Sequence, residues 1–375
     1  MMKSREASIF TAAAILTAVL CFSGNLLAYS GGTGEPNNPY KIASVADFNQ
    51  LSATPTHWNK SFILTADINL TGLTFTQAPI APDTSTSSGF QGTDFTGIFD
   101  GNGHVISNLT ITTSTQGYIG LFGWVGTGGQ IRNLGVENVN IEGYDFVGGL
   151  VGYNYYGTLS SCYANGLVAG NSYVGGLVGK NYYNTLSSCY ANGLVAGNSY
   201  VGGLIGYNDH VPLTDCYATG SVTGTGSFVG GMIGYNNGGT LTSCHATGSV
   251  SGGSDIGGLV GYNLRYSLSY RGTITGCYAT GSVSGTSGVG GLVGRNGNGD
   301  YTGGTLTTCH ATGSVTGNSS VGGLVGVNGS SVTGCYATGS VSGGSDIGGL
   351  VGYLEWYNSY DSLTSCYATG SVIGT

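Results

Sequence analysis

Aromatic, acidic and arginine side chains gather in the variable segments of a repeated pattern. Aromatic rings pack on the apolar faces of sugars, and polar groups beside them fix the orientation of a ligand. Arg265, Arg271, Asp300, Glu355 and Asp361 stand among these rings. We therefore expect glycan or protein ligands to bind here, with these candidate residues: Tyr155, Tyr156, Tyr182, Tyr183, Tyr266, Tyr270, Tyr301, Trp356, Tyr357 and Tyr360.

The pattern that positions these residues is Val-Gly-Gly-Leu-Val-Gly-Tyr-Asn at residues 147 to 154, followed by Leu-Ser-Ser-Cys-Tyr-Ala at residues 159 to 164. It occurs eight times, with a period of about 27 residues that lengthens to the low thirties, which lies in the range of solenoid repeats. From the asparagine to the cysteine of each copy the count varies between 7 and 14 residues, whereas from the cysteine to the next glycine pair it is 13 or 14. Insertions therefore leave the coil at one corner, which often marks a binding face; the alternative is that only this corner tolerates extra length.

Two polar columns are predicted to be structural. The asparagines stand at one corner, where stacked amides can bond from coil to coil: Asn154, Asn181, Asn208, Asn236, Asn263, Asn296 and Asn328. The cysteines recur once per copy: Cys162, Cys189, Cys216, Cys244, Cys277, Cys309, Cys335 and Cys366.

Eight cysteines in an exported protein would ordinarily indicate disulfides. Equivalent residues on stacked parallel strands are about 4.8 Å apart, which exceeds the Cβ separation that a disulfide needs. We therefore predict a column of buried thiols. Two degenerate copies precede the array, and Leu109 and Leu134 are aligned with the cysteine position. The sequence contains no zinc-type spacing, so no metal or cofactor is predicted.

The residue after each cysteine should face outward if the cysteine faces inward. These residues form an aromatic strip, which suits either a ligand or cross-strand packing: Tyr163, Tyr190, Tyr217, His245, Tyr278, His310, Tyr336 and Tyr367.

The composition indicates a folded protein and argues against nucleic-acid binding. Glycine accounts for 73 of 375 residues, charged residues for 7% and hydrophobic residues for 40%, so the chain has enough apolar surface to fold. The net charge is −8 and no basic run occurs. Nucleic acid is therefore not a predicted partner.

Residues 1 to 28 read as a secretory signal, because Lys3 and Arg5 precede an apolar run that ends before Ala28. The alternatives are a lipoprotein acylated at Cys21 and a retained membrane anchor. The large Leu20 argues against the first, and the shortness of the run argues against the second. We expect no membrane insertion once the signal is removed.

Residues 29 to 96 are predicted to form an N-terminal cap with lead-in strands. A Ser-x-x-Asp sequence at Ser44 opens a short helix that would cover the first coil. Residues 71 to 97 are expected to form a loop. Asp100 and Asn102 belong to an Asp-Gly-Asn-Gly segment that predicts a tight turn, with calcium binding as the alternative.

The glycine-rich segment followed by Cys-Tyr-Ala-Thr-Gly-Ser-Val resembles the GLUG-motif repeats of bacterial surface and secreted proteins, over roughly residues 118 to 375. The resemblance implies an all-β fold, a right-handed parallel β-helix (β-solenoid, pectin-lyase-like), here residues 97 to 375 with two degenerate and eight regular coils. It also implies occurrence in adhesins or beside metallopeptidase domains. The His-Glu-x-x-His sequence of such a peptidase is absent.

The predicted function is a non-catalytic module, secreted or on the surface of a bacterium, which is adhesive or a spacer. Its partners would be polysaccharide or a host or neighbour cell-surface protein, and its uncapped last coil would allow end-to-end self-association. The enzymatic alternative is a polysaccharide lyase or glycosidase, for which Asp209, His210 and Asp215 are the residues that gather near one corner. A third reading is an ice-binding face formed by Thr219, Thr247, Thr280, Thr312, Thr338 and Thr369.

Overall fold

The computed structural model describes residues 29 to 374, except 86, 88, 265, 268 to 270, 298 to 303 and 356 to 361. The predicted signal segment, residues 1 to 28, lies outside the described residues. So do five of the candidate ligand-binding residues: Tyr270, Tyr301, Trp356, Tyr357 and Tyr360.

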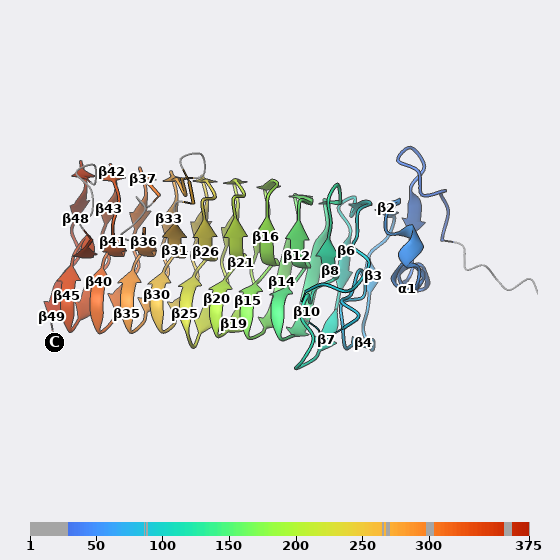
Figure 1. Cartoon of the computed structure of the whole chain (residues 1–375), viewed down its shortest axis with the longest axis horizontal. Coiled ribbons are helices and arrows are strands. Elements are labelled where there is room, and N and C mark those ends of the chain that lie inside the picture. Colours follow the sequence, from blue (N-terminus) through green and yellow to red (C-terminus); the bar gives the residue numbers. More distant parts are fainter. Residues whose placement is uncertain are drawn as a thin grey trace, which may run out of the picture.

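The chain winds into a parallel β-solenoid of about nine turns with about 28 residues per turn, which confirms the predicted fold class. Figure 1 shows a rod in which successive coils stack along the long axis. Strands of neighbouring coils pair in register, so that Val174 lies opposite Val201 and Leu186 opposite Leu213. Because the register is kept, each position of the repeat becomes a column along the rod.

Each regular coil contributes strands to four sheets in turn. Sheet 1 has eight strands: β11 (Asp145–Gly148), β15 (Ser172–Gly175), β20 (Ser199–Gly202), β25 (Ser227–Gly230), β30 (Ser254–Gly257), β35 (Ser287–Gly290), β40 (Ser319–Gly322) and β45 (Ser345–Gly348). Sheet 2 has nine: β8 (Phe122–Val125), β12 (Val151–Tyr155), β16 (Val178–Tyr182), β21 (Ile205–Asp209), β26 (Ile233–Asn237), β31 (Val260–Leu264), β36 (Val293–Asn296), β41 (Val325–Asn328) and β46 (Val351–Leu354).

Sheet 3 has twelve strands and runs from near the N-terminal helix to the last coil. Its members are β1 (Tyr40–Ile42), β2 (Ser61–Leu64), β5 (Ile98–Asp100), β9 (Gln130–Arg132), β13 (Thr158–Ser160), β17 (Leu186–Ser187), β22 (Leu213–Thr214), β27 (Leu241–Thr242), β32 (Ile274–Thr275), β37 (Leu306–Thr307), β42 (Val332–Thr333) and β47 (Leu363–Thr364). The strands of residues 29 to 96 therefore stack directly on those that follow residue 97.

Sheet 4 consists of two ladders joined by the long strands β10 (Gly135–Glu142) and β14 (Tyr163–Ala169). The first ladder adds β3 (Ile68–Asn69), β6 (Val105–Ser107), β18 (Tyr190–Ala191), β23 (Tyr217–Ala218), β28 (His245–Ala246), β33 (Tyr278–Ala279), β38 (His310–Ala311), β43 (Tyr336–Ala337) and β48 (Tyr367–Ala368). The second adds β4 (Thr74–Phe75), β7 (Thr110–Thr112), β19 (Leu194–Gly197), β24 (Val222–Gly224), β29 (Val250–Ser251), β34 (Val283–Ser284), β39 (Val315–Thr316), β44 (Val341–Gly343) and β49 (Val372–Gly374).

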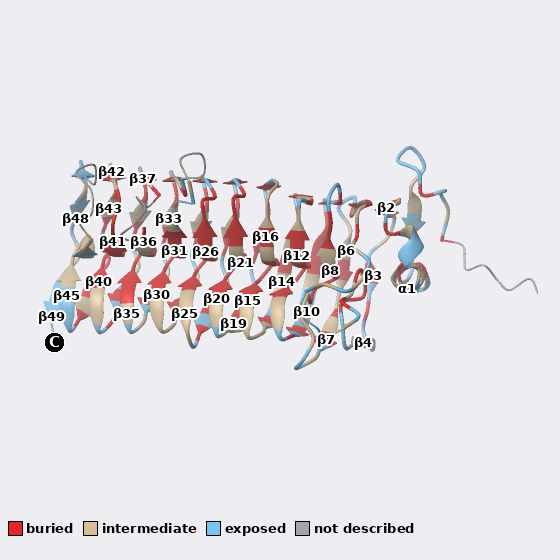
Figure 2. Cartoon of the chain, in the orientation of Figure 1, coloured by how far each residue is buried: buried red, intermediate tan, exposed pale blue. Residues whose placement is uncertain are grey.

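The core consists of apolar columns that face the axis. In one coil they are Val174, Leu177, Val178, Leu186 and Cys189, all with at most 1% of their surface exposed. Figure 2 shows many buried residues in the strands of the middle coils, whereas the last coil is largely exposed or intermediate. The columns repeat because one coil cannot bury its apolar face without a neighbour.

The cysteines form one of these columns. All eight are free thiols in the structure; seven are buried and Cys366, in the last coil, is partly exposed. Each thiol donates to the carbonyl oxygen two residues upstream, as Cys189 Sγ does to Ser187 O at 3.2 Å. Burial raises the pKa of the Cys189 thiol, which keeps it protonated.

The predicted alignment of the degenerate copies is half right. Leu134 precedes Gly135, which pairs with Tyr163, so Leu134 does lie opposite Cys162. Leu109 precedes Thr110, which pairs with Asn140 in the second ladder. Leu109 therefore lies opposite Val139, and its alignment with the cysteines is wrong.

The single α-helix among the described residues is α1 (Val45–Ala53), followed by the 3₁₀ turn η1 (Pro55–His57). Ser44 is its N-cap, and the Ser44 hydroxyl accepts a hydrogen bond from Asp47 N at 3.2 Å. Phe48 and Leu51 are fully buried. The helix lies at the N-terminal end of the rod, next to the first strands of sheet 3 (Figure 1).

Candidate functional site

The corner between sheets 2 and 3 carries the aromatic candidates, and the asparagine column holds it in place. Asn154 Nδ2 donates to Asn181 Oδ1 at 2.8 Å, and the chain of amide bonds continues through every coil to Asn328. The second N–H of Asn154 donates to Gly157 O at 2.7 Å, within its own corner loop. These amides are buried and out of reach of water, so the bonds along the column satisfy their donors and acceptors.

Four of the predicted tyrosines meet at this corner. Tyr155 and Tyr182 are stacked with centroids 5.2 Å apart, and Tyr156 and Tyr183 are stacked at 5.5 Å. The two pairs touch edge to face, with Tyr182 and Tyr183 at 4.6 Å. Successive residues of one strand end and its loop therefore supply two parallel stacks.

The next coil extends the second stack. His210 is stacked on Tyr183 at 4.6 Å, and Tyr266, which an insertion supplies, meets His210 edge to face at 4.2 Å. We call the set Tyr155, Tyr156, Tyr182, Tyr183, His210 and Tyr266 the corner cluster. Tyr156 is 38% exposed and Tyr266 is 56% exposed, so the two ends of the cluster face solvent.

The residues of the enzymatic alternative do not come together as a group. Asp209 and His210 are both buried, at 8% and 7% exposure, with Asp209 Oδ1 2.8 Å from His210 Nδ1. Asn237 donates a second bond to the same oxygen at 2.7 Å. Burial lowers the pKa of His210, which favours its neutral form. Asp215 is exposed and lies past β22, at the opposite end of that strand.

Sequence reasoning missed a second aromatic surface where sheets 1 and 2 fold against each other. On sheet 1, Phe146 and Tyr173 stack at 4.8 Å, and Tyr173 and Tyr200 at 4.7 Å. On sheet 2, Tyr207 and Tyr235 stack at 4.9 Å. The rings of the two sheets then touch across the fold. We call this set the groove cluster: Tyr118, Trp124, Phe146, Tyr153, Tyr173, Tyr200, Tyr207, Phe228, Tyr235 and Tyr262.

The close approach of the two sheets requires a glycine. A Cβ on Gly179 would lie 2.6 Å from the backbone of Phe146 and Val147 in the preceding coil. The signal for the groove cluster was present in the sequence, since an aromatic residue precedes Val-Gly-Gly and another precedes Asn in several copies. Lys180 takes the second position in one coil and lies between the Tyr153 and Tyr207 rings, 5.2 and 5.1 Å from their centroids.

Farther along the same fold, charged residues replace the rings. Arg295 Nε donates to Asp255 Oδ1 at 3.1 Å, and Arg295 Nη1 donates to Glu355 Oε1 at 2.7 Å. Burial raises the pKa of Asp255, although Arg295 opposes the shift. The fold between sheets 1 and 2 therefore carries rings as far as Tyr262 and an ion-paired arginine beyond them.

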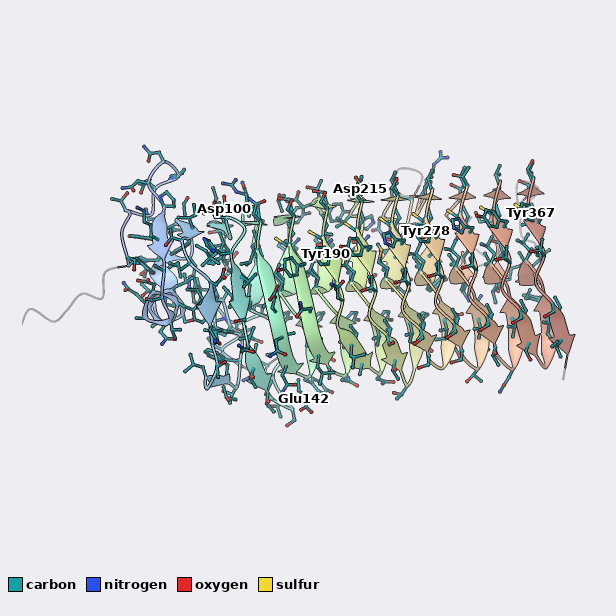
Figure 3. All side chains as sticks on the ribbon, turned by 180° about the vertical axis from the view of Figure 1, so that it is seen from behind. Asp100, Glu142, Tyr190, Asp215, Tyr278 and Tyr367 are labelled. Atoms are coloured by element: carbon teal, nitrogen blue, oxygen red, sulfur yellow. The ribbon has the colours of Figure 1, made fainter. Side chains whose placement is uncertain are left out.

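The aromatic strip on sheet 4 is a single continuous stack. Figure 3 shows Tyr190, Tyr278 and Tyr367 in one row along the rod. Neighbouring rings are 4.7 to 5.2 Å apart and within 9° of parallel, from Tyr163 to Tyr367. Because each inner ring has both faces covered, this strip offers ring edges rather than faces to a sugar.

The Asp100 segment forms the predicted turn, with Asn102 and Gly103 at positive φ. Asp100 Oδ1 accepts from Asn102 N at 2.8 Å, and Asp100 Oδ2 accepts from Arg132 Nε at 2.8 Å. The carboxylate is thus engaged in the turn and in an ion pair. Within the described ranges, no group of three or more His, Cys, Asp or Glu side chains could hold a metal ion. The same residues include no helix long and apolar enough to cross a membrane.

Comparison with known proteins places these features in a family. The model of the GLUG motif matches six segments: residues 147–168, 170–195, 197–223, 252–284, 285–316 and 317–342. Halomucin of Haloquadratum walsbyi is 38% identical over 153 residues, which are 39% of this chain and 2% of halomucin. A putative Gly-rich membrane protein of Evansella cellulosilytica is 35% identical over 130 residues, which are 34% of this chain and 14% of that protein. The matches thus span a small part of the length of these curated relatives.

Among solved structures, a putative immunoglobulin A1 protease from Bacteroides ovatus superposes with a TM-score of 0.50. The match covers 92% of this chain and 87% of that one at 18% sequence identity. At this identity the similarity concerns the fold alone.

Proposed function

The chain is a GLUG-motif repeat protein with a parallel β-solenoid fold, and we propose that it is a non-catalytic module that presents its corner cluster to a glycan at or outside the cell surface. The observation that carries this proposal is the construction of the corner. A buried amide ladder fixes the coils, and the aromatic side chains stand at the strand ends and in the loops that follow these strands, with Tyr266 supplied by an insertion. A rigid scaffold with variable loops is a common arrangement for binding.

Two rings of the corner cluster are suited to a sugar. Tyr156 ends the stack of Tyr156, Tyr183 and His210, so one of its faces is not covered by the stack. Tyr266 touches His210 only edge to face and is more than half exposed. An exposed ring face beside hydroxyl groups is the surface on which a sugar packs.

The names of the relatives agree with a surface location, since halomucin and a putative Gly-rich membrane protein are each similar to about a third or more of this chain. We do not propose catalysis. The buried Asp209 and His210 pair is separated from Asp215 by the length of a strand, and the His210 ring is enclosed between Tyr183 and Tyr266. Paired carboxylates at the spacing of a glycosidase would be needed instead.

The test is retention of residues 29 to 375 on a panel of immobilised and soluble polysaccharides, with new reducing or unsaturated ends assayed in the same tubes. We expect retention without product, and Tyr156→Ala and Tyr266→Ala to weaken binding about tenfold or more, as substitution of an anchoring ring does. Leu194→Ala is the matched control, because Leu194 is an exposed apolar residue on sheet 4 outside the cluster. The candidates Trp356, Tyr357 and Tyr360 can be substituted in the same assay.

Product formation would contradict the proposal and would make Asp209 and His210 the first residues to substitute. Retention that survives both tyrosine substitutions would move the binding surface away from the corner cluster.

A further inference from the structure

A cavity of about 210 Å³ opens where an irregular loop lies over the beginning of sheet 1. The loop contributes Asp83, Ser85 and Ser87, while Asp145 at the start of β11 and the preceding Tyr144 line the other side. Tyr118 and Phe146, two stacked rings of the groove cluster, also line the cavity. The cavity therefore lies at the N-terminal end of the groove cluster.

Two carboxylates give this cavity a negative potential. Asp83 is only 4% exposed, and its Oδ1 accepts from Gln91 N at 2.8 Å. Asp145 Oδ1 accepts from Ser172 N at 3.0 Å. Neither Oδ2 accepts a hydrogen bond from any residue that the structure describes, and no lysine or arginine is among the lining residues. Each carboxylate thus retains an oxygen for a ligand that carries N–H donors.

The pKa of Tyr118 indicates that both carboxylates lie close to its ring. Burial raises the pKa of Tyr118, and the negative charges of Asp83 and Asp145 raise it further. A cation in the cavity would face these same charges across a short distance. A positively charged ligand is therefore favoured over an anionic one.

Tyr144 differs from the other rings of this surface. Phe146 has one face against Tyr118 and the other against Tyr173, each with centroids 4.8 Å apart. Tyr144 makes no ring contact with any described residue and is 48% exposed. Its ring is available to an incoming apolar face or to a cation.

We propose that this cavity binds an amino sugar with a free amine, as one unit of the glycan chain that the proposed function assigns to the protein. The protonated amine donates hydrogen bonds to Asp83 and Asp145, and the C–H face of the sugar packs on Tyr144. Ser85, Ser87 and Thr115 supply hydroxyl groups at the rim for the hydroxyls of the sugar. The cavity fits a bare calcium ion less well, because calcium takes six to eight oxygen ligands and the cavity offers two carboxylates.

The test is a calorimetric titration of residues 29 to 375 at pH 6 with glucosamine oligomers and with fully N-acetylated oligomers of the same length. We expect the free-amine oligomers to bind about tenfold more tightly or better, because acetylation removes the charge and two of the N–H donors. Asp145→Asn keeps an acceptor for Ser172 but removes the charge, and it should abolish this preference. Tyr144→Ala should weaken the binding of both oligomers.

Asp215→Asn is the matched control, since it removes one carboxylate charge from an exposed turn outside the cavity. Equal affinity for the two oligomers, or a preference that survives Asp145→Asn, would overturn the inference. So would a calcium titration in which the ion binds and displaces the free-amine oligomer at one equivalent. If neutral polysaccharide is still retained through Tyr156 and Tyr266, only the amino-sugar site fails; if no glycan is retained, the proposed function fails with it.

Discussion

The coils between residues 145 and 230 and those between residues 287 and 348 have the same inward columns but different outward ones on sheets 1 and 2. Val174 and Val321 occupy one inward column, and Cys189 and Cys309 another, all fully buried. Outward, Tyr200 of the first region corresponds to Ser320 of the second, and Tyr207 corresponds to Val327.

The comparison distinguishes the inward residues, which the fold requires, from the outward residues of sheets 1 and 2, which can vary. Both regions keep the same sheets and register although one is lined by rings and the other by small or charged residues. The outward rings of sheets 1 and 2 are therefore not required for stacking of the coils. We infer that their concentration in the first region belongs to binding, and the following experiments test that separation from the largest expected effect to the smallest.

Removal of an asparagine from the middle of the amide ladder should have the largest effect, and an equal one in both regions. Asn208→Ala in the first region and Asn296→Ala in the second each leave a buried donor and a buried acceptor without a partner, and Asn208→Ala also leaves the Val211 carbonyl without its donor. We expect each to lower the free energy of unfolding by about 3–5 kcal/mol, since each orphaned buried group costs about 1–3 kcal/mol. Urea midpoints measure the change.

Asn192→Ala is the control for the ladder, because Asn192 is exposed and bonds only to the Thr219 hydroxyl at the surface. It should change stability by less than about 0.5 kcal/mol. A ladder substitution that behaves like this control would show that the amide column does not hold the coils.

Truncation of an outward ring should distinguish the two regions. Tyr200 contacts Tyr173, Phe228, Tyr207 and Tyr235, with centroids between 4.7 and 5.8 Å. Tyr200→Ala should lower stability by about 2 kcal/mol, less than for a fully buried ring. Ser320→Ala, at the equivalent position, should be nearly neutral. Equal urea midpoints for the two variants would remove the energetic difference between the regions.

Substitution by glycine where the coil turns from sheet 3 into sheet 4 should have a smaller effect than the changes above, and the effect should be a gain in stability. Thr308 and Asp215 hold φ of 51° and 53° there, whereas other copies have Gly276 and Gly334 at 62°. Thr308→Gly should stabilise by about 0.5–1 kcal/mol, because a β-branched residue is strained in this region. Asp215→Gly should gain less, since aspartate tolerates the conformation better.

Thr307→Gly is the control for the turn, since Thr307 lies in strand β37 and should lose stability on the same change. A melting temperature of Thr308→Gly at or below that of the unmodified chain would contradict the account of this corner.

The smallest effect should come from acidification through the sheet 4 stack, which runs through both regions. Burial lowers the pKa values of His245 and His310. The native state then binds fewer protons than the unfolded state, so stability is complete above a pH of about 6.5 and declines as the pH falls. His245→Tyr and His310→Tyr, which restore the commoner residue of the column, should each reduce the decline in urea midpoint between pH 7.5 and 5.5. An unchanged decline in the double variant would place the titrating groups elsewhere.

Much of the fold follows from the sequence because every coil repeats the same inward residues. The period predicts stacking, the glycine and cysteine positions predict the columns, and Ser44 predicts the helix cap. The alignment of Leu109 failed because the degenerate copies lack the landmarks that distinguish the two ladders of sheet 4.

The site was less predictable. Proximity of Tyr155, Tyr156, Tyr182 and Tyr183 follows from their equal places in successive coils, and His210 holds the place of Tyr183 in the next coil. Tyr266 comes from an inserted segment, for which the repeat gives no place, and only the structure brings it to His210. The groove cluster depends on how closely sheet 1 approaches sheet 2, which the backbone around Gly179 decides. The cavity near Tyr144 depends on the path of a non-repeating loop, for which the repeat gives no register.

Hydrogen exchange of the full chain, free and saturated with the glycan that it retains most tightly, tests the central claim most directly. The account predicts slower exchange at the loops after β12, β16 and β21 and at the Tyr144 cavity, with no change in the first ladder of sheet 4 between residues 306 and 343. Protection spread evenly along the rod, or confined to the sheet 4 stack, would contradict a binding surface built from the corner cluster.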